Sequence, residues 1–189
     1  MRGQAKTGLL IIIGLVALVG FYGWSSYNSL VRLHEQIPAA WSQVENVLQR
    51  RNDLIPNLVA TVKGYAKHEQ VIFGQVSDAL KSYNRATTVS EKAAANDSIT
   101  SLLSRIMAIS IQYPNLKADA QFARLSDELA GTENRIAVER MRFNDMVRDY
   151  NTKVKTFPTN IIAKLSGLKT DEAYFKAAES AKTVPTVTF

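Results

Sequence analysis

The side chains of this sequence best suited to acid–base chemistry are His68 and Glu69, which are adjacent and follow Tyr65. An imidazole and a carboxylate placed within reach of a substrate transfer protons near neutral pH. A polar patch on a helix surface explains the same pair without any substrate. The only other histidine is His34, and neither histidine has a carboxylate three residues before it. The Glu-x-x-His pairs of di-iron helical bundles are therefore absent from the sequence.

Other catalytic patterns are also missing from the sequence. It contains no His-Glu-x-x-His zinc motif, no glycine-rich phosphate loop and no Gly-x-Ser-x-Gly elbow. Cysteine is absent, which removes disulfides, thiolate metal sites and cysteine nucleophiles. We therefore expect no catalytic, cofactor-binding or metal-binding residues, and a protein that is not an enzyme. An unfamiliar site around His68 and Glu69 is the remaining enzymatic alternative.

The stretch from Glu133 to Asn151, "ENRIAVERMRFNDMVRDYN", is dense in charged residues. Glu139 with Arg142 and Asp145 with Arg148 have opposite charges three residues apart, a spacing that supports an exposed helix face. One interpretation is therefore a solvated face. The other is that some of these residues bond across to Arg50, Arg51 or Asp53 and fix how the helices dock.

The stretch from Gln49 to Leu58, "QRRNDLIPNL", contains signals for a helix end followed directly by a helix start. Two arginines suit a last turn, Asn52 tolerates the left-handed conformation, Asp53 is a good cap, and Pro56 suits a first turn. The rival interpretation is one helix kinked at Pro56, because apolar positions seven residues apart keep their phase across the stretch. A single helix would approach 60 residues and about 88 Å, and the other predicted helices would be too short to cover it. We therefore predict a corner near Asn52.

Two further breaks are predicted. The segment "RATTVSE" (85–91) is polar and offers Ser90 as an N-cap. The segment "YPNLKAD" (113–119) has a proline, then Asn115 as a cap, then Asp119 in the first turn, where a carboxylate suits the helix dipole.

Between these breaks the apolar residues recur every three or four positions, as on one face of a helix. No segment of similar length alternates with period two, so we expect no sheet. Four helices of about 24, 33, 24 and 40 residues would overlap in length. The predicted fold is all-α, with an N-terminal transmembrane helix continuing into an antiparallel up-and-down four-helix bundle with long helices.

The N-terminal segment Gly8 to Trp24 has no charged residue. Its 17 residues rise about 26 Å, and the uncharged stretch from Thr7 to Val31 rises about 37 Å, so the segment is long enough to cross a bilayer. Three aromatic residues cluster at its far end, where rings favour the headgroup layer: Tyr22, Trp24 and Tyr27. A cleaved signal peptide is the alternative, but no Ala-x-Ala exit follows the apolar run.

Charge favours one orientation and excludes one class of partner. Arg2 and Lys6 precede the apolar run, and few basic residues follow it closely, so we expect a cytoplasmic N-terminus and an extracytoplasmic bundle in a bacterial inner membrane. The net charge is +6, but no basic tract with interleaved aromatics is present. We therefore expect a lipid partner through residues 8–27 and no nucleic acid.

The tail differs from the rest of the chain. Residues 158–189 contain two short helical pieces at most and end in an extended, threonine-rich stretch. Insertion of Val187 to Phe189 into a sheet-edge receptor is a minor alternative. The predicted organisation is thus a short N-terminal segment (1–7), a transmembrane helix (8–27), a bundle (28–157) and this tail.

Three blocks resemble the LemA family: "YNSLVRLHEQIPAAWSQVENVLQRRNDLIPNLVATVKGYAKHE", "YPNLKADAQFARLSDELAGTENRIAVERMRFNDMVRDYN" and "FPTNIIA". The likeness covers nearly the whole chain and is specific in order and spacing. It implies a bacterial protein with one N-terminal membrane helix and a helical-bundle domain. It transfers no catalytic or ligand-binding residue to this sequence.

The function expected from these features is a membrane-anchored scaffold or protein-interaction module. In a four-helix arrangement the corners at 49–58 and 113–119 would meet at the membrane-distal end, which would face a protein partner. The candidate interaction surface comprises Arg50, Arg51, Asn52, Asp53, Asn57, Asn115, Lys117 and Asp119. The main alternative is a self-assembling protein that organises or shapes lipid, which the basic balance suggests.

Overall fold

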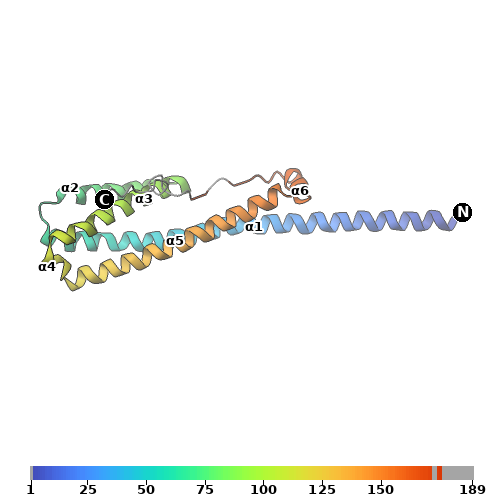
Figure 1. Cartoon of the computed structure of the whole chain (residues 1–189). Coiled ribbons are helices and arrows are strands. Elements are labelled where there is room, and N and C mark those ends of the chain that lie inside the picture. Colours follow the sequence, from blue (N-terminus) through green and yellow to red (C-terminus); the bar gives the residue numbers. More distant parts are fainter. Residues whose placement is uncertain (1, 172–173, 176–189) are drawn as a thin grey trace, which may run out of the picture. The chain divides into compact units, whose positions relative to one another are not determined.

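A computed structural model describes residues 2–171 and 174–175, with side chains from Leu9 onward. Every regular element in this part of the chain is a helix (Figure 1), which confirms the all-α prediction. The helices are α1 (Arg2–Tyr65), α2 (Gln70–Arg85), α3 (Val89–Gln112), α4 (Pro114–Lys117), α5 (Ala120–Lys155) and α6 (Thr159–Leu165).

α1 is one helix of 64 residues, so the corner predicted near Asn52 is wrong. Five residues seven apart along α1 that kept the apolar phase are buried, although the next in the series, Tyr65, is 40% exposed: Leu30, Ile37, Val44, Arg51 and Leu58. A break would have moved half of them away from the core. Pro56 is exposed on α1, and its missing N–H removes one intrahelical bond without ending the helix.

The corner after α1 lies at residues 66–69 instead. The N–H of Ala66 still bonds to the Val62 carbonyl at 2.8 Å, and Ala66 is fully buried. Four polar residues then separate Ala66 from Val71 in the sequence. That gap in the apolar pattern marks the turn, and it divides the expected second helix between α1 and α2.

The other two breaks are confirmed in position, but different residues cap them. Thr88 caps α3, with its hydroxyl accepting from the Glu91 N–H at 3.2 Å while the Glu91 carboxylate accepts from the Thr88 N–H. This capping box replaces the predicted cap at Ser90. Asn115 lies inside the short helix α4, and Asp119 caps α5 instead, accepting from the Phe122 N–H at 2.8 Å.

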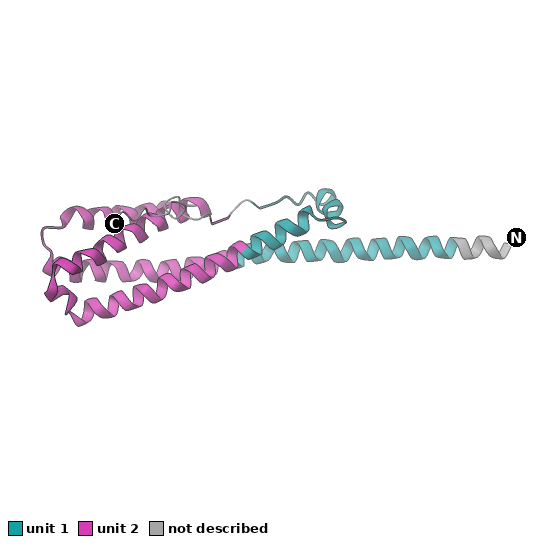
Figure 2. Ribbon diagram, viewed as in Figure 1, with its two compact units in different colours: residues 1–40, 145–172 teal, residues 41–144, 173–189 magenta. Residues whose placement is uncertain are grey.

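The chain divides into two compact units, each built from separate pieces of sequence (Figure 2). Unit 1 comprises Met1–Ala40 and Asp145–Glu172, and unit 2 comprises Trp41–Asn144 and Ala173–Phe189. The prediction instead placed residues 28–157 in one bundle. That bundle stays a prediction, but the predicted series of four separate long helices is corrected, because α1 includes the first expected helix and the start of the second.

Unit 2 contains the later part of α1, all of α2, α3 and α4, and the first part of α5. Apolar side chains from all five helices are buried in it, among them Ile55, Val76, Ile106, Leu116 and Ile136. Burial of such side chains is the main stabilising contribution to a unit of this kind.

Unit 1 contains the first part of α1, the end of α5 and α6. The rings of His34 and Tyr150 lie 5.2 Å apart, and the Tyr150 hydroxyl donates to the Lys169 carbonyl at 2.8 Å. Asn151 exchanges two hydrogen bonds with the backbone of Asp171. These contacts hold the segment after α6 against α5.

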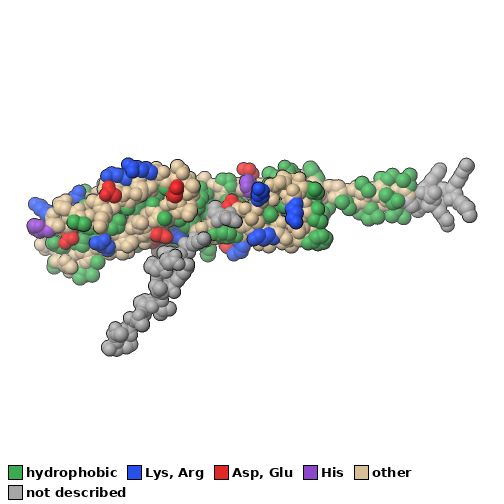
Figure 3. Space-filling model, turned by 90° about the horizontal axis from the view of Figure 1, so that it is seen from above, with side chains coloured by type: hydrophobic (Ala, Val, Ile, Leu, Met, Phe, Trp, Pro, Cys, Tyr) green, Lys and Arg blue, Asp and Glu red, His purple; other side chains and the backbone are tan. Residues whose placement is uncertain are grey.

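The described residues leave the apolar start of α1 uncovered. The side chains from Leu9 to Tyr22 are exposed, and α1 contains an 18-residue window that is apolar enough for the helix to cross a membrane. Figure 3 shows these apolar side chains in green along the exposed part of the helix. Exposure of so many large apolar side chains is unfavourable in water and favourable in lipid.

Candidate functional site

The residues of the candidate interaction surface do not gather at one place. Arg51 and Asn52 are buried in α1 and are not available to a partner in this structure. Arg50, Asp53 and Asn57 are exposed on α1, and Asn115 and Lys117 are exposed on α4. The reason is the continuity of α1, which places the stretch 49–58 in mid-helix rather than at an end.

The end of unit 2 is formed by a different part of α1. The Tyr65 hydroxyl, in the last residue of α1, donates to the Asp119 carboxylate at 2.8 Å. The Phe122 N–H and this hydroxyl lower the pKa of Asp119, because both stabilise its ionised form. The corner 66–69 and the segment 113–119 therefore meet, and the stretch 49–58 does not reach them.

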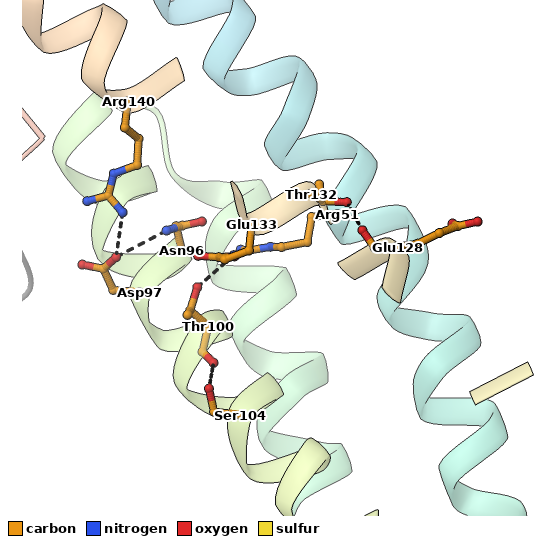
Figure 4. A network of polar contacts seen from close by, with 9 residues as sticks. All are labelled: Arg51, Asn96, Asp97, Thr100, Ser104, Glu128, Thr132, Glu133 and Arg140. Carbon is orange, nitrogen blue, oxygen red and sulfur yellow. Dashed lines mark hydrogen bonds and ion pairs between the residues drawn. The ribbon is translucent and has the colours of Figure 1, made fainter. Parts of the chain in front are cut away.

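A buried polar network lies between α1, α3 and α5 in unit 2 (Figure 4). Arg51 is fully buried, and its Nη1 donates to the Thr100 hydroxyl at 2.9 Å and to the Glu133 carboxylate at 3.1 Å. The cross-helix interpretation of the charged stretch 133–151 is thereby confirmed for Glu133. The solvated interpretation holds for Arg142, which is 65% exposed and pairs along α5 at 2.7 Å with Glu139, whose side chain is 18% exposed.

Burial dominates the electrostatics of Arg51. Desolvation lowers the pKa of its guanidinium, and the neighbouring Glu133 opposes this shift. The Glu133 side chain is 43% exposed, so the carboxylate stays partly hydrated while the cation does not. Arg51 Nε and Nη2 have no hydrogen-bond partner among the described residues. Glu133 therefore offsets the desolvation of the Arg51 charge more than its other neighbours do, and a lone buried cation at this position would be strongly unfavourable.

Further polar groups continue the network along α3. Asn96 is fully buried and donates to Asp97 at 3.3 Å. Asp97 in turn pairs with Arg140 of α5 at 3.5 Å. The network thus links three helices through directional contacts, which specify their register more than they add stability.

A second set of polar groups lies beside Arg51. Lys92 of α3 pairs with Glu45 of α1, and Lys92 Nζ lies 5.9 Å from the centre of the Tyr83 ring. Burial raises the pKa of Tyr83, the charge of Glu45 adds to this shift, and Arg51 opposes it. Tyr83 therefore stays a neutral phenol near neutral pH.

The network has a groove beside it, between α3 and α5, with a volume of about 400 Å³. Thr100 and Glu133 line this groove together with apolar side chains such as Leu103 and Leu129. Its remaining polar groups are hydroxyls and Asp127. The groove contains no histidine or lysine to act with these carboxylates as an acid–base pair.

Chemistry elsewhere in the described chain is limited. His68 and Glu69 lie in the turn between α1 and α2, not on a helix face as expected. No group of three metal-ligating side chains occurs in the described part of the chain.

The sequence analysis did not predict that Asn144 and its aromatic neighbours bind the segment around Phe175. Asn144 exchanges two hydrogen bonds with the backbone of Phe175, at 2.9 and 3.0 Å. The Phe175 ring lies 5.5 Å from Trp41 and 6.0 Å from Phe143, and the guanidinium of Arg140 lies 4.4 Å from it. The recurring Phe-Asn and Tyr-Asn pairs on α5 were the available signal, since each asparagine bonds one backbone segment.

Known proteins resemble this chain over most of its length. The chain is 27% identical to magnetosome protein MamQ of Magnetospirillum gryphiswaldense, over 92% of this chain and 74% of that protein. It is 27% identical to magnetosome protein MamQ 2 of Paramagnetospirillum magneticum, over 96% and 76%. It is 25% identical to protein LemA of Metamycoplasma hominis, over 90% and 78%. The model of the LemA family matches residues 40–189, and the chain therefore belongs to the LemA family.

Proposed function

We propose that this protein is a membrane-anchored scaffold that presents a helical surface to a protein partner. The observation that carries the proposal is the continuity of α1. One helix includes the exposed apolar stretch from Leu9 and the first helical segment of unit 2. LemA family membership and the similarity to MamQ and LemA proteins fit a membrane-associated protein.

Our proposed partner surface is the end of unit 2 where α1 and α3 finish. Two large apolar side chains are exposed there, Val71 at 74% and Ile111 at 77%. Lys67, Asn115 and Lys117 are exposed on the adjoining turn and on α4. Apolar side chains surrounded by polar groups are typical of a protein-binding patch. This surface includes Asn115 and Lys117 of the candidate interaction surface predicted from the sequence. The corner 66–69 takes the place of the predicted stretch 49–58.

Site-specific photo-crosslinking in cells tests this surface. A photoreactive residue at Lys67 or Asn115 should capture a protein partner in the full chain. Gln43 is the matched control, because it is an exposed polar position on α1 in the same unit. Adducts from Gln43 alone would contradict the proposed surface.

The proposal includes a place and an orientation in the cell. We place the protein in a bacterial inner membrane as a single-pass protein, with a cytoplasmic N-terminus and unit 2 outside. The basic residues ahead of the apolar stretch, Arg2 and Lys6, support this orientation. A cysteine at Ser101, which is exposed in unit 2, should react with a membrane-impermeant maleimide in intact spheroplasts. Reaction only after lysis would reverse the orientation.

The rival function is self-assembly that organises or shapes lipid. Light scattering of the full chain in detergent, with and without anionic lipid, separates the two functions. The scaffold proposal expects a monomer whose mass does not respond to lipid. Lipid-dependent oligomers would favour the rival function.

A further inference from the structure

α6 and the turn before it have apolar side chains that the described residues of unit 1 leave exposed. Phe157 is 75% exposed, Ile161 is 49% exposed and Leu165 is 81% exposed. Ile161 and Leu165 are four positions apart on α6, so they project from the same side of the helix. Phe157 lies in the turn directly before the helix. The opposite side is packed, with Thr159 and Ala163 buried. A helix of seven residues with apolar groups on both sides is poorly suited to water.

The packed side of α6 rests against one short part of α1. A methyl group added at Gly23 would lie 3.6 Å from Ile162 Cδ1, so Ile162 approaches the α1 backbone there. Tyr22 is hydrogen-bonded to Thr159 and to Ser26, and Ser26 is buried. Figure 1 shows α6 lying beside α1 at this point, and both belong to unit 1.

This part of α1 is the end of the stretch that we assign to the membrane. Gly23 lies four residues before Tyr27, a rise of about 6 Å along the helix. Trp24 and Tyr27 are exposed at the same level, and such side chains favour the headgroup layer. In the proposed membrane placement, α6 therefore lies where the hydrocarbon gives way to headgroups, whichever way the chain crosses the membrane.

The charges around α6 match a lipid surface. Between positions 153 and 169 the only charged residues are four lysines, and no acidic residue occurs: Lys153, Lys155, Lys164 and Lys169. All four side chains are exposed, and Lys153 also donates to the Ser29 hydroxyl. Apolar side chains next to exposed lysines are the pattern of a helix that lies in the interface of an anionic membrane.

The geometry points to α6 and its preceding turn as a membrane-surface docking element for anionic lipid. Phe157, Ile161 and Leu165 enter the boundary between headgroups and acyl chains, while the lysines bind lipid phosphates. The element rests on the proposed membrane anchorage and adds a second lipid contact beside the span. It would limit rotation and tilt of α1 relative to the bilayer surface.

The absence of cysteine from the chain allows a direct test. The full chain with Leu165→Cys carries an environment-sensitive fluorophore and is reconstituted into phosphatidylcholine vesicles with and without phosphatidylglycerol. Emission should shift to the blue, more strongly with phosphatidylglycerol, and lipids spin-labelled near the headgroup should quench it. Glu35→Cys, exposed in the same unit, is the matched control and should report water.

Each other outcome has a distinct meaning. An aqueous signal at position 165 in chains that resist carbonate extraction would overturn the docking element and leave the anchor intact. Extraction of the whole chain by carbonate would overturn both. A blue shift that spin-labelled lipid does not quench would mean that a second copy covers this face, and would overturn the lipid assignment.

The lysines are tested separately from the apolar face. The triple variant Lys155→Gln, Lys164→Gln and Lys169→Gln retains Lys153, which contacts Ser29. It should lose the difference between vesicles with and without phosphatidylglycerol. An undiminished difference would show that these lysines do not bind the lipid phosphates.

Discussion

The segments 49–58 and 113–119 contain the same kinds of residues and adopt opposite structures. Each has an asparagine, an aspartate and a proline in a short polar stretch. The first is the uninterrupted middle of α1, and the second is a true corner between α3 and α5. Local signals for a helix end are thus present in both segments, and they allow a helix to end without forcing it to do so.

The difference lies in what each segment contacts. Arg51 is buried against Glu133 and Thr100, and a break at Asn52 would remove it from them. At the other segment, Asp119 accepts from the Phe122 N–H and from Tyr65, and both bonds require the chain to restart there. Long-range contacts therefore decide which polar stretch becomes a corner.

The largest expected effect concerns the ion pair in mid-helix. Glu133→Ala should lower the free energy of unfolding by about 3 kcal/mol, because it leaves the buried Arg51 without a counter-charge. Arg51→Met should lower it much less, since an apolar side chain of similar length replaces a charge that needs a partner. Denaturant unfolding of the full chain in mild detergent measures both. Equal losses, or a negligible loss for Glu133→Ala, would contradict the dependence of Arg51 on Glu133.

Replacing Pro56 should change the free energy of unfolding less than Glu133→Ala does, and in the opposite direction. Pro56→Ala should raise the free energy of unfolding by about 1 kcal/mol, because alanine restores a bond within a continuous helix. Pro114→Ala is the matched control at the first residue of α4, where proline is favourable, and no gain is expected. A loss of stability in Pro56→Ala would support a corner at 49–58 after all.

The two aspartates should differ in the same comparison. Asp119→Ala should lower the unfolding midpoint, since it removes the cap of α5 and the partner of Tyr65. Asp53→Ala removes only a contact with Gln49 on the surface of α1, and its midpoint should stay close to that of the original chain. The expected loss for Asp119→Ala is smaller than for Glu133→Ala. Similar midpoints for the two aspartate variants would refute the capping role.

The smallest effect is a pH dependence. The pKa of Asp119 is lowered in the folded chain, from an ordinary value of 3.8, so its ionised form stabilises the fold above that pH. This contribution is lost as the pH falls through the lower, folded pKa. When the pH is lowered from about 6 to about 3, the unfolding midpoint of Asp119→Asn should fall less than that of the original chain. Parallel losses would show that Asp119 is not the titrating group.

The sequence by itself determined the helical class, the apolar N-terminal stretch and the breaks at 85–91 and 113–119. These features depend on local pattern: period, apolar length, a polar stretch between apolar runs and a proline at a helix start. Bonding across helices was one of two interpretations of the charged stretch 133–151, and the sequence did not choose Glu133 and Arg51 as the pair.

Only the tertiary structure decided the rest. The position of the first corner, the burial of Arg51 and Asn52, and the packing of α6 on Tyr22 and Gly23 depend on residues far apart in the chain. Helix-end signals carry about 1 kcal/mol each, whereas the burial of a helix face carries several times more. Where the two disagree, as at Asn52, the packing of distant residues prevails.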